Sequence, residues 1–196
     1  MSRIILALIA VLLVVSCSQR SDTAPRDLDN ACAILKERSH YVRAFRKAKR
    51  TWGVEPAVLM AMIYQESKFI ANNRTPHQYA LGVIPIGRQS SAYGYPQALD
   101  GTWREYQQDR GGSGARRHNI HDAVDFMGWY MSQSTEAIGI SINDTRNQYL
   151  AYHEGRTGYL RGTYRSKSWL INIASKVEDR AMMYQRQLKN CRVARF

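Results

Sequence analysis

The spacing of apolar residues along the chain predicts a mostly helical protein. In several stretches apolar side chains recur every three or four positions, which is the period of an α-helix with one buried face. The stretches with this period are residues 31–52, 55–69, 95–107, 119–132, 145–153 and 168–189. Residues 71–89, 110–115 and 155–162 are interrupted by glycine, proline or asparagine, so we expect loops there.

The second of these helices carries the first candidate for chemistry, Glu66. Pro56 suits the first helical turn. Glu66 follows Met62 by four residues and Ile63 by three, so its carboxyl group lies on the same face of the helix as these apolar side chains. An ionised carboxylate is costly in such surroundings, and its pKa should rise toward the range that a general acid needs. The alternative is that Glu66 lies at the edge of this face and reaches water.

The N-terminus resembles a bacterial lipoprotein signal. Residues 4–15 form an apolar run that is shorter than the roughly 20 residues of a membrane-spanning helix but suits a signal peptide. The run ends in Val14-Val15-Ser16-Cys17, which resembles a lipobox and implies lipid attachment at Cys17. We therefore expect a signal peptide at residues 1–16 and a tether at 17–30. The alternative is a buried N-terminal strand with an incidental cysteine.

Charge narrows the class of partner. The chain has 28 Lys and Arg against 16 Asp and Glu, a formal net charge of +12. Removing residues 1–16 takes away Arg3, which leaves 12 − 1 = +11 on a chain long enough for one domain with a real core. This excess implies an anionic partner. For an exported protein we expect peptidoglycan stem peptides or the membrane surface, and we expect no nucleic acid.

Two cysteines remain after Cys17 is assigned to lipid. Cys32 lies in the first helical stretch and Cys191 just after the last one. In an oxidising periplasm such a pair can form a disulfide. The alternative is two buried free thiols.

Four short motifs in order carry a resemblance to a known family. Gln65-Glu66-Ser67-Lys68-Phe69 looks like the Glu-Ser signature of the soluble lytic transglycosylase and goose-type lysozyme superfamily. Ala92-Tyr93-Gly94-Tyr95-Pro96-Gln97 looks like that family's Ala-x-Gly-Leu-Met-Gln, with Tyr95-Pro96 in place of Leu-Met. Asn119-Ile120 resembles its Asn-Ile helix start, and Ala151-Tyr152-His153 resembles its Ala-Tyr-Asn, with His153 replacing Asn.

The resemblance implies a mostly α-helical, lysozyme-like single domain at residues 31–196 with little or no sheet. It implies cleavage of the β-1,4 bond between N-acetylmuramic acid and N-acetylglucosamine in peptidoglycan. Glu66 would protonate the leaving oxygen, then accept the proton of the muramyl C6 hydroxyl as a 1,6-anhydro ring closes. No cofactor is implied. With the lipobox, the expected location is the periplasm, anchored by lipid to the outer membrane.

The resemblance also assigns substrate-binding roles. Tyr152 would contact the catalytic carboxylate through its hydroxyl group, and Ser67 and Gln97 would orient the substrate. Gly94 would present its backbone to a sugar, and Tyr93 and Tyr95 their rings. Each of Ser67, Gln97 and the tyrosines has an ordinary structural alternative, in solvent or in the core.

His153 and Glu154 leave the reaction open. His153 could titrate near neutral pH or could be a core histidine. If Glu154 faces the cleft, a second carboxylate permits hydrolysis of the same bond, as in a muramidase. A non-catalytic wall-binding lipoprotein is a further alternative. His118 and His121 form the closest histidine pair, but without a third ligand in register they indicate no metal site.

Overall fold

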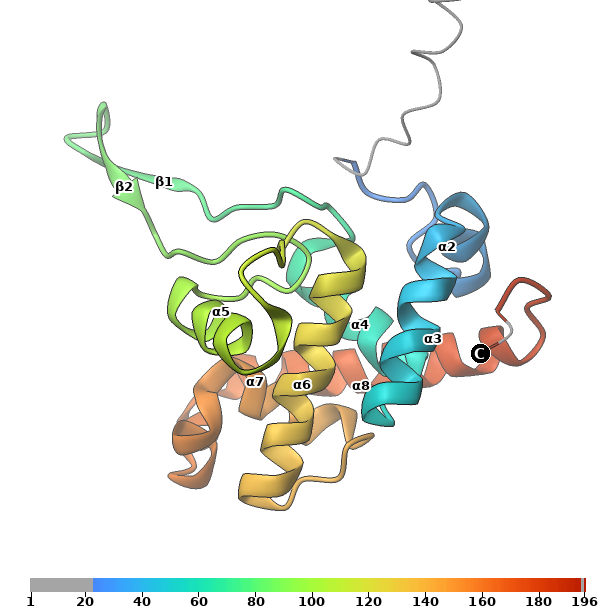
Figure 1. The fold of residues 1–196 in the computed structure, drawn as a ribbon. Helices are drawn as coiled ribbons and strands as arrows, with labels where there is room; N and C mark the ends of the chain where they lie inside the picture. Colours follow the sequence, from blue (N-terminus) through green and yellow to red (C-terminus); the bar gives the residue numbers. More distant parts are fainter. Residues whose placement is uncertain (1–22, 195) are drawn as a thin grey trace, which may run out of the picture.

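The structure is a computed structural model that describes residues 23–194 and 196. The expected signal peptide at residues 1–16, and Cys17 with it, lie outside the described residues. The described part is mostly helical with a single two-stranded sheet, which confirms the expected fold class (Figure 1).

Two helices replace the single helix expected at residues 31–52. Helix α2 (Ala31–Glu37) begins at Asn30, whose side chain accepts a hydrogen bond from the Ala33 amide at 3.0 Å. The backbone leaves the helix at Arg38, and α3 (His40–Trp52) follows. Arg38 is buried, and its guanidinium donates to the carbonyl of Thr23 at 3.2 Å. Apolar spacing alone could not reveal this break, because both helices face the same core.

Helix α4 (Pro56–Ser67) lies at the centre of the fold. Every residue from Pro56 to Ile63 is buried, so the helix is enclosed all round rather than along one stripe. The expected amphipathic pattern was wrong in this respect, because Ala57, Met60 and Ala61 are small or apolar and let neighbours pack on every side. Polar side chains enter only in the last turn, where Gln65 and Glu66 stand.

Residues 71–107 differ most from expectation. The expected loop contains a hairpin of β1 (His77–Ala80) and β2 (Ile84–Arg88), which projects from the helical body (Figure 1). The helix expected from Pro96 begins only at α5 (Asp100–Tyr106) and continues as the short π-helix η2 (Gln107–Gly111). Gln97 has a positive φ of 48°, which a helix does not allow.

The last third of the chain forms three helices. Helix α6 (Ile120–Ile138) runs past the expected end at residue 132. Helix α7 (Thr145–Leu160) continues through most of the expected loop at 155–162, with a break only at Gly155 (φ 73°, ψ 157°). After the 3₁₀ turn η3 (Thr163–Ser166), α8 (Ser168–Lys189) has the expected bounds.

The core of the domain is formed where the helices pack against one another. Helix α3 packs on α6, and α4 and α7 pack on α8. The buried side chains form one cluster that includes the aromatic residues Tyr41, Phe45, Phe126 and Tyr184. No helix within the described residues combines the length and apolar character that crossing a bilayer would need.

A disulfide joins the two ends of the domain. The sulfur atoms of Cys32, in α2, and Cys191, after α8, are 2.07 Å apart, across a sequence separation of 159 residues. Gln187 adds a second link, because its side chain accepts from the Ala31 amide at 2.8 Å and donates to the Asp29 carbonyl at 2.8 Å. The bridge therefore fastens α2 to the end of α8.

Replacing both cysteines by serine should lower the free energy of unfolding by about 2–5 kcal/mol, because the unfolded chain then loses a long covalent loop. Urea unfolding of the Cys32→Ser/Cys191→Ser variant and of the parent, both without reductant, measures the difference. Equal unfolding midpoints would contradict a stabilising role.

Candidate functional site

A groove of about 520 Å³ opens beside the end of α4. Its walls come from the base of the hairpin, the turn before α5, and helices α5, α6 and α7. The residues that line it are Glu66, Thr75, Ala92, Gln97, Ala98, Leu99, Thr102, Phe126, Tyr130, Tyr152, His153, Glu154 and Gly155. Two acids, Glu66 and Glu154, are therefore in the same groove.

Glu66 has the properties of a general acid. Glu66 is half-buried. It stands in the last turn of α4 and lines the groove. Burial raises the pKa of Glu66 to about 7, even though a hydrogen bond from Tyr149 and the charge of Lys68 both lower it. Because burial outweighs both opposing effects, a large fraction of this carboxyl group is protonated at neutral pH.

The tyrosine that donates to Glu66 is Tyr149, not Tyr152. Tyr149 is buried in α7, one turn before Tyr152. The Tyr152 hydroxyl instead donates to the Pro96 carbonyl at 2.6 Å, while its ring lines the groove. Burial and then the charge of Glu66 raise the pKa of the Tyr152 hydroxyl, so Tyr152 lies close to the carboxyl group but donates its hydrogen bond to Pro96. The sequence did not identify Tyr149, because the family motif covers only residues 151–153. Outside the motif, a tyrosine in a helical pattern is indistinguishable from a core residue.

Gln97 and Gly94 fix the turn before α5, which forms the wall of the groove opposite α7. The Gln97 amide donates to the carbonyls of Asn73 at 3.1 Å and Gly94 at 2.8 Å, so it fastens the turn to the segment after α4. Gly94 has a φ of 77°, and a Cβ there would come within 2.3 Å of the Arg117 carbonyl oxygen. Only glycine fits this position. The Gly94 amide donates to Asn73 and is not among the groove-lining groups.

Besides Gly94, three predicted substrate-binding residues do not line the groove. Ser67 is 2% exposed, and its hydroxyl donates to the Ile63 carbonyl at 3.2 Å. Tyr95 is 1% exposed, and its hydroxyl pairs with that of Tyr41 at 2.9 Å in the core. Tyr93 lines a neighbouring cavity rather than the groove. Tyr95 therefore cannot stack on a sugar. The sequence did not reveal this, because in an irregular turn the spacing of residues does not show which side chains face solvent.

His153 and Glu154 lie at the α7 end of the groove. His153 is exposed, with Nδ1 3.1 Å from a Glu154 carboxylate oxygen and its ring edge-on to Trp169. It is therefore not a core histidine. Gly155, which follows Glu154, breaks the helix and turns the chain at this end of the groove.

Glu154 is held in its ionised form. The ammonium group of Lys167 lies 2.8 and 3.0 Å from the two carboxylate oxygens, and the Thr163 hydroxyl donates to one of them. Burial raises the pKa of Glu154, but hydrogen bonds from Lys167, Thr163 and His153 together lower it to about 2. The two groove acids therefore differ sharply: Glu66 can give a proton at neutral pH, and Glu154 cannot.

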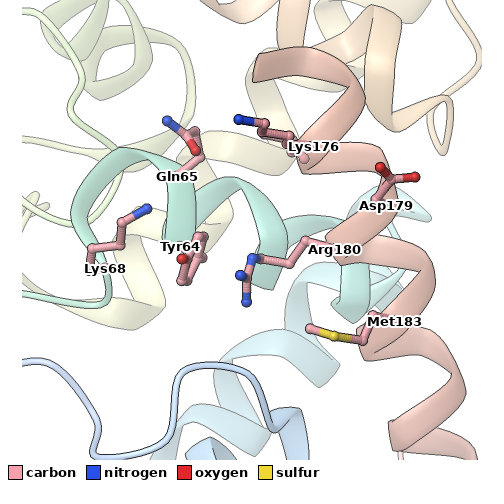
Figure 2. A pocket seen from close by; sticks show the side chains of 8 residues that line it. Tyr64, Gln65, Lys68, Lys176, Asp179, Arg180 and Met183 are labelled. Carbon is pink, nitrogen blue, oxygen red and sulfur yellow. The ribbon is translucent and has the colours of Figure 1, made fainter. Parts of the chain in front are cut away.

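A second hollow, of about 370 Å³, lies between α4 and α8 and has a different character. The ammonium group of Lys68 lies 3.6 Å from the centre of the Tyr64 ring, and the Arg180 guanidinium lies 3.4 Å from it. The carboxylate of Asp179 points away from this ring (Figure 2). Three cations, Lys68, Lys176 and Arg180, line this hollow against one acid, Asp179, and Glu66 is not in its lining.

Metal ligation has no support in the part of the chain that the structure describes. No group of three or more His, Cys, Asp and Glu side chains there is arranged to hold a metal ion.

Replacing Glu66 by glutamine should stabilise the protein at high pH. An unperturbed glutamate ionises near pH 4.5, whereas folded Glu66 ionises near pH 7. Between these pH values the folded state binds more protons than the unfolded state, so stability falls as the pH rises through this range. Glu66→Gln removes that loss and should gain roughly 1–3 kcal/mol over wild type at pH 8, but little at pH 4.

Urea unfolding at pH 4 and pH 8 measures this difference. Glu136→Gln, at an exposed glutamate of α6, is the matched control and should show no such gain. An equal difference between Glu66→Gln and wild type at both pH values would contradict the burial of an ionisable carboxyl group.

A family model described as Transglycosylase SLT domain matches residues 5–191, which is most of the chain. No curated protein matches the sequence. The match runs through Glu66, the turn at Gly94 and Gln97, and both groove-lining segments of α6 and α7.

Proposed function

The chain belongs to the transglycosylase SLT domain family, and we infer from its groove how it acts on peptidoglycan. Membership in this family implies lytic transglycosylase activity on that polymer. We propose that the chain cleaves the β-1,4 bond between N-acetylmuramic acid and N-acetylglucosamine without water. Glu66 acts first as acid and then as base, and the product ends in 1,6-anhydro-N-acetylmuramic acid.

The observation that carries this proposal is the raised pKa of Glu66 inside the groove. A carboxyl group with a pKa of about 7 is both protonated enough to donate and basic enough to accept a proton at neutral pH. The first role protonates the glycosidic oxygen as the bond breaks. In the second role, Glu66 removes the proton of the muramyl C6 hydroxyl as the C6 oxygen attacks the anomeric carbon. One residue with this pKa serves both steps.

The remaining groove residues suit a sugar. The half-buried ring of Tyr152 offers apolar surface to the face of a pyranose ring, and the buried rings of Phe126 and Tyr130 pack against it from the core. Gln97 and Thr102 add polar side chains on the other wall. A strand bound between these walls would place a glycosidic oxygen near Glu66.

Hydrolysis is the second candidate, because Glu154 lines the same groove. Ordinary glycosidases use two carboxyl groups, one of which activates water or attacks the sugar. A carboxylate whose pKa is near 2 and whose oxygens accept bonds from Lys167 is a weak base. This environment favours a role for Glu154 in holding η3 against α7. It therefore favours the intramolecular hydroxyl over water as the nucleophile.

Location is part of the proposal. The substrate lies outside the cytoplasm, and the apolar run at residues 4–15 followed by Cys17 is suited to export and lipid attachment. We therefore place the active chain in the periplasm, tethered through Cys17 to the outer membrane.

Digestion of purified sacculi tests the reaction. Wild type should release muropeptides that weigh one water less than hydrolysed ends, as seen by mass spectrometry. Glu66→Gln should lower release by a factor of about 100 or more, since general acid–base catalysis contributes at least that much. Glu136→Gln is the matched control and should retain wild-type release. Unchanged release by Glu66→Gln would contradict its role, and ends without the loss of water would show a muramidase.

A further inference from the structure

A cavity of about 460 Å³ lies on the far side of the segment that forms one wall of the groove. We call it the basic pocket, and define it by Arg74, Tyr93, Arg104, Arg116, Arg117 and His118. Asp100 is the only acid among the residues that line it. Its character is thus opposite to that of the groove, which has two acids.

One arginine of the basic pocket is structural. The Arg117 guanidinium donates to the carbonyls of Ala98 at 2.7 Å and Ser91 at 3.1 Å, and to the Asp100 carboxylate at 2.6 Å. It therefore uses the one carboxylate of the pocket and fixes the turn between β2 and α5.

The other three arginines have no carboxylate partner. Arg74, Arg104 and Arg116 are exposed, and within the described residues none of their side chains forms an ion pair. The Arg116 guanidinium donates to the carbonyls of Ser113 at 3.1 Å and Ala115 at 3.2 Å, which orient it but do not neutralise its charge. The Arg74 guanidinium lies 4.2 Å from the centre of the Tyr93 ring, which holds it at the pocket wall by a cation–π contact. Like charges gathered in this way repel one another unless an anion lies between them.

The basic pocket and the groove share one wall. Ala92, Leu99 and Thr102 line the groove, whereas Tyr93 and Arg104, from the same segment, line the pocket. Thr102 and Arg104 stand two residues apart on α5, so the two cavities lie on different faces of one helix, whose diameter with side chains is roughly 10–12 Å. A peptide of four or five residues spans about 13–18 Å when extended. A peptide attached to a sugar in the groove can therefore reach the pocket.

We propose that the basic pocket binds the carboxylate groups of the stem peptide carried by the muramic acid in the groove. The inference rests on the proposed function, which places that sugar beside Glu66. Guanidinium groups bind carboxylates through paired hydrogen bonds, and three arginines without a carboxylate partner supply more than one such site. The pocket thereby selects glycan strands that still carry peptides over strands that have lost them.

The test compares two substrates for the full chain: glycan strands with intact stem peptides, and strands stripped of peptides by an amidase. The measured quantity is the ratio of the release rate on peptide-bearing strands to that on stripped strands. Arg74→Gln, Arg104→Gln and Arg116→Gln should each lower this ratio by about two- to fivefold, as expected for exposed ion pairs. The triple variant should lower it by more than about tenfold.

Arg186→Gln, at an exposed position on α8, is the matched control and should leave the ratio at its wild-type value. A second arm needs no variant: wild type should show a similar loss on sacculi whose free carboxylates have been converted to amides. Circular dichroism of each variant verifies its fold.

The proposal is overturned if the triple variant and the control give the same ratio, or if amidated sacculi are cleaved as fast as untreated ones. This failure is distinguishable from a failure of the proposed function. If release still depends on Glu66 while the ratio does not move, only the basic pocket is misassigned. If Glu66→Gln releases as much as wild type from both substrates, the reaction itself is wrong and the pocket proposal falls with it.

Discussion

The burial of the Glu66 carboxyl group constrains the arrangement of the elements around it. Helix α4 is enclosed on all sides until its last turn, so Glu66 is the point at which the core meets the groove. Desolvation raises the pKa of this group, and Tyr149 and Lys68 moderate the rise so that the result lies near neutrality. A more exposed carboxyl group would be ionised, and one without these two neighbours would stay protonated to higher pH.

The rest of the groove depends on keeping two chain segments fixed opposite this group. On one side, Gly94, Gln97 and the Arg117 side chain fasten the turn between β2 and α5 through backbone carbonyls. On the other, Gly155 bends α7 beside Glu154, which Lys167 holds from η3 and α8. The turn between β2 and α5 lines both the groove and the basic pocket. The contacts that hold this turn therefore determine the geometry of both cavities.

Apolar spacing predicted the helical segments because burial enforces it, whereas Glu66 depended on the Glu-Ser motif as well, since α4 is buried all round and has no single apolar stripe. The prediction matched α8 at both bounds and failed where hydrogen bonds to distant residues fix the backbone, as at Arg38 and Gln97. Family motifs located the groove segments, but they could not say which tyrosine reaches Glu66 or that Tyr95 points into the core. Those choices depend on how α7 and the turn rotate against α4, and short motifs do not encode that rotation.

Direct titration of Glu66 tests the central claim most closely. Carbon-13 NMR of protein labelled at the glutamate carboxyl carbons, with Glu66→Gln used to assign the signal, gives the pKa of this one group. We expect a midpoint near pH 7, set by burial and moderated by Tyr149 and Lys68. A midpoint near 4.5, the value of a solvated glutamate, would contradict it.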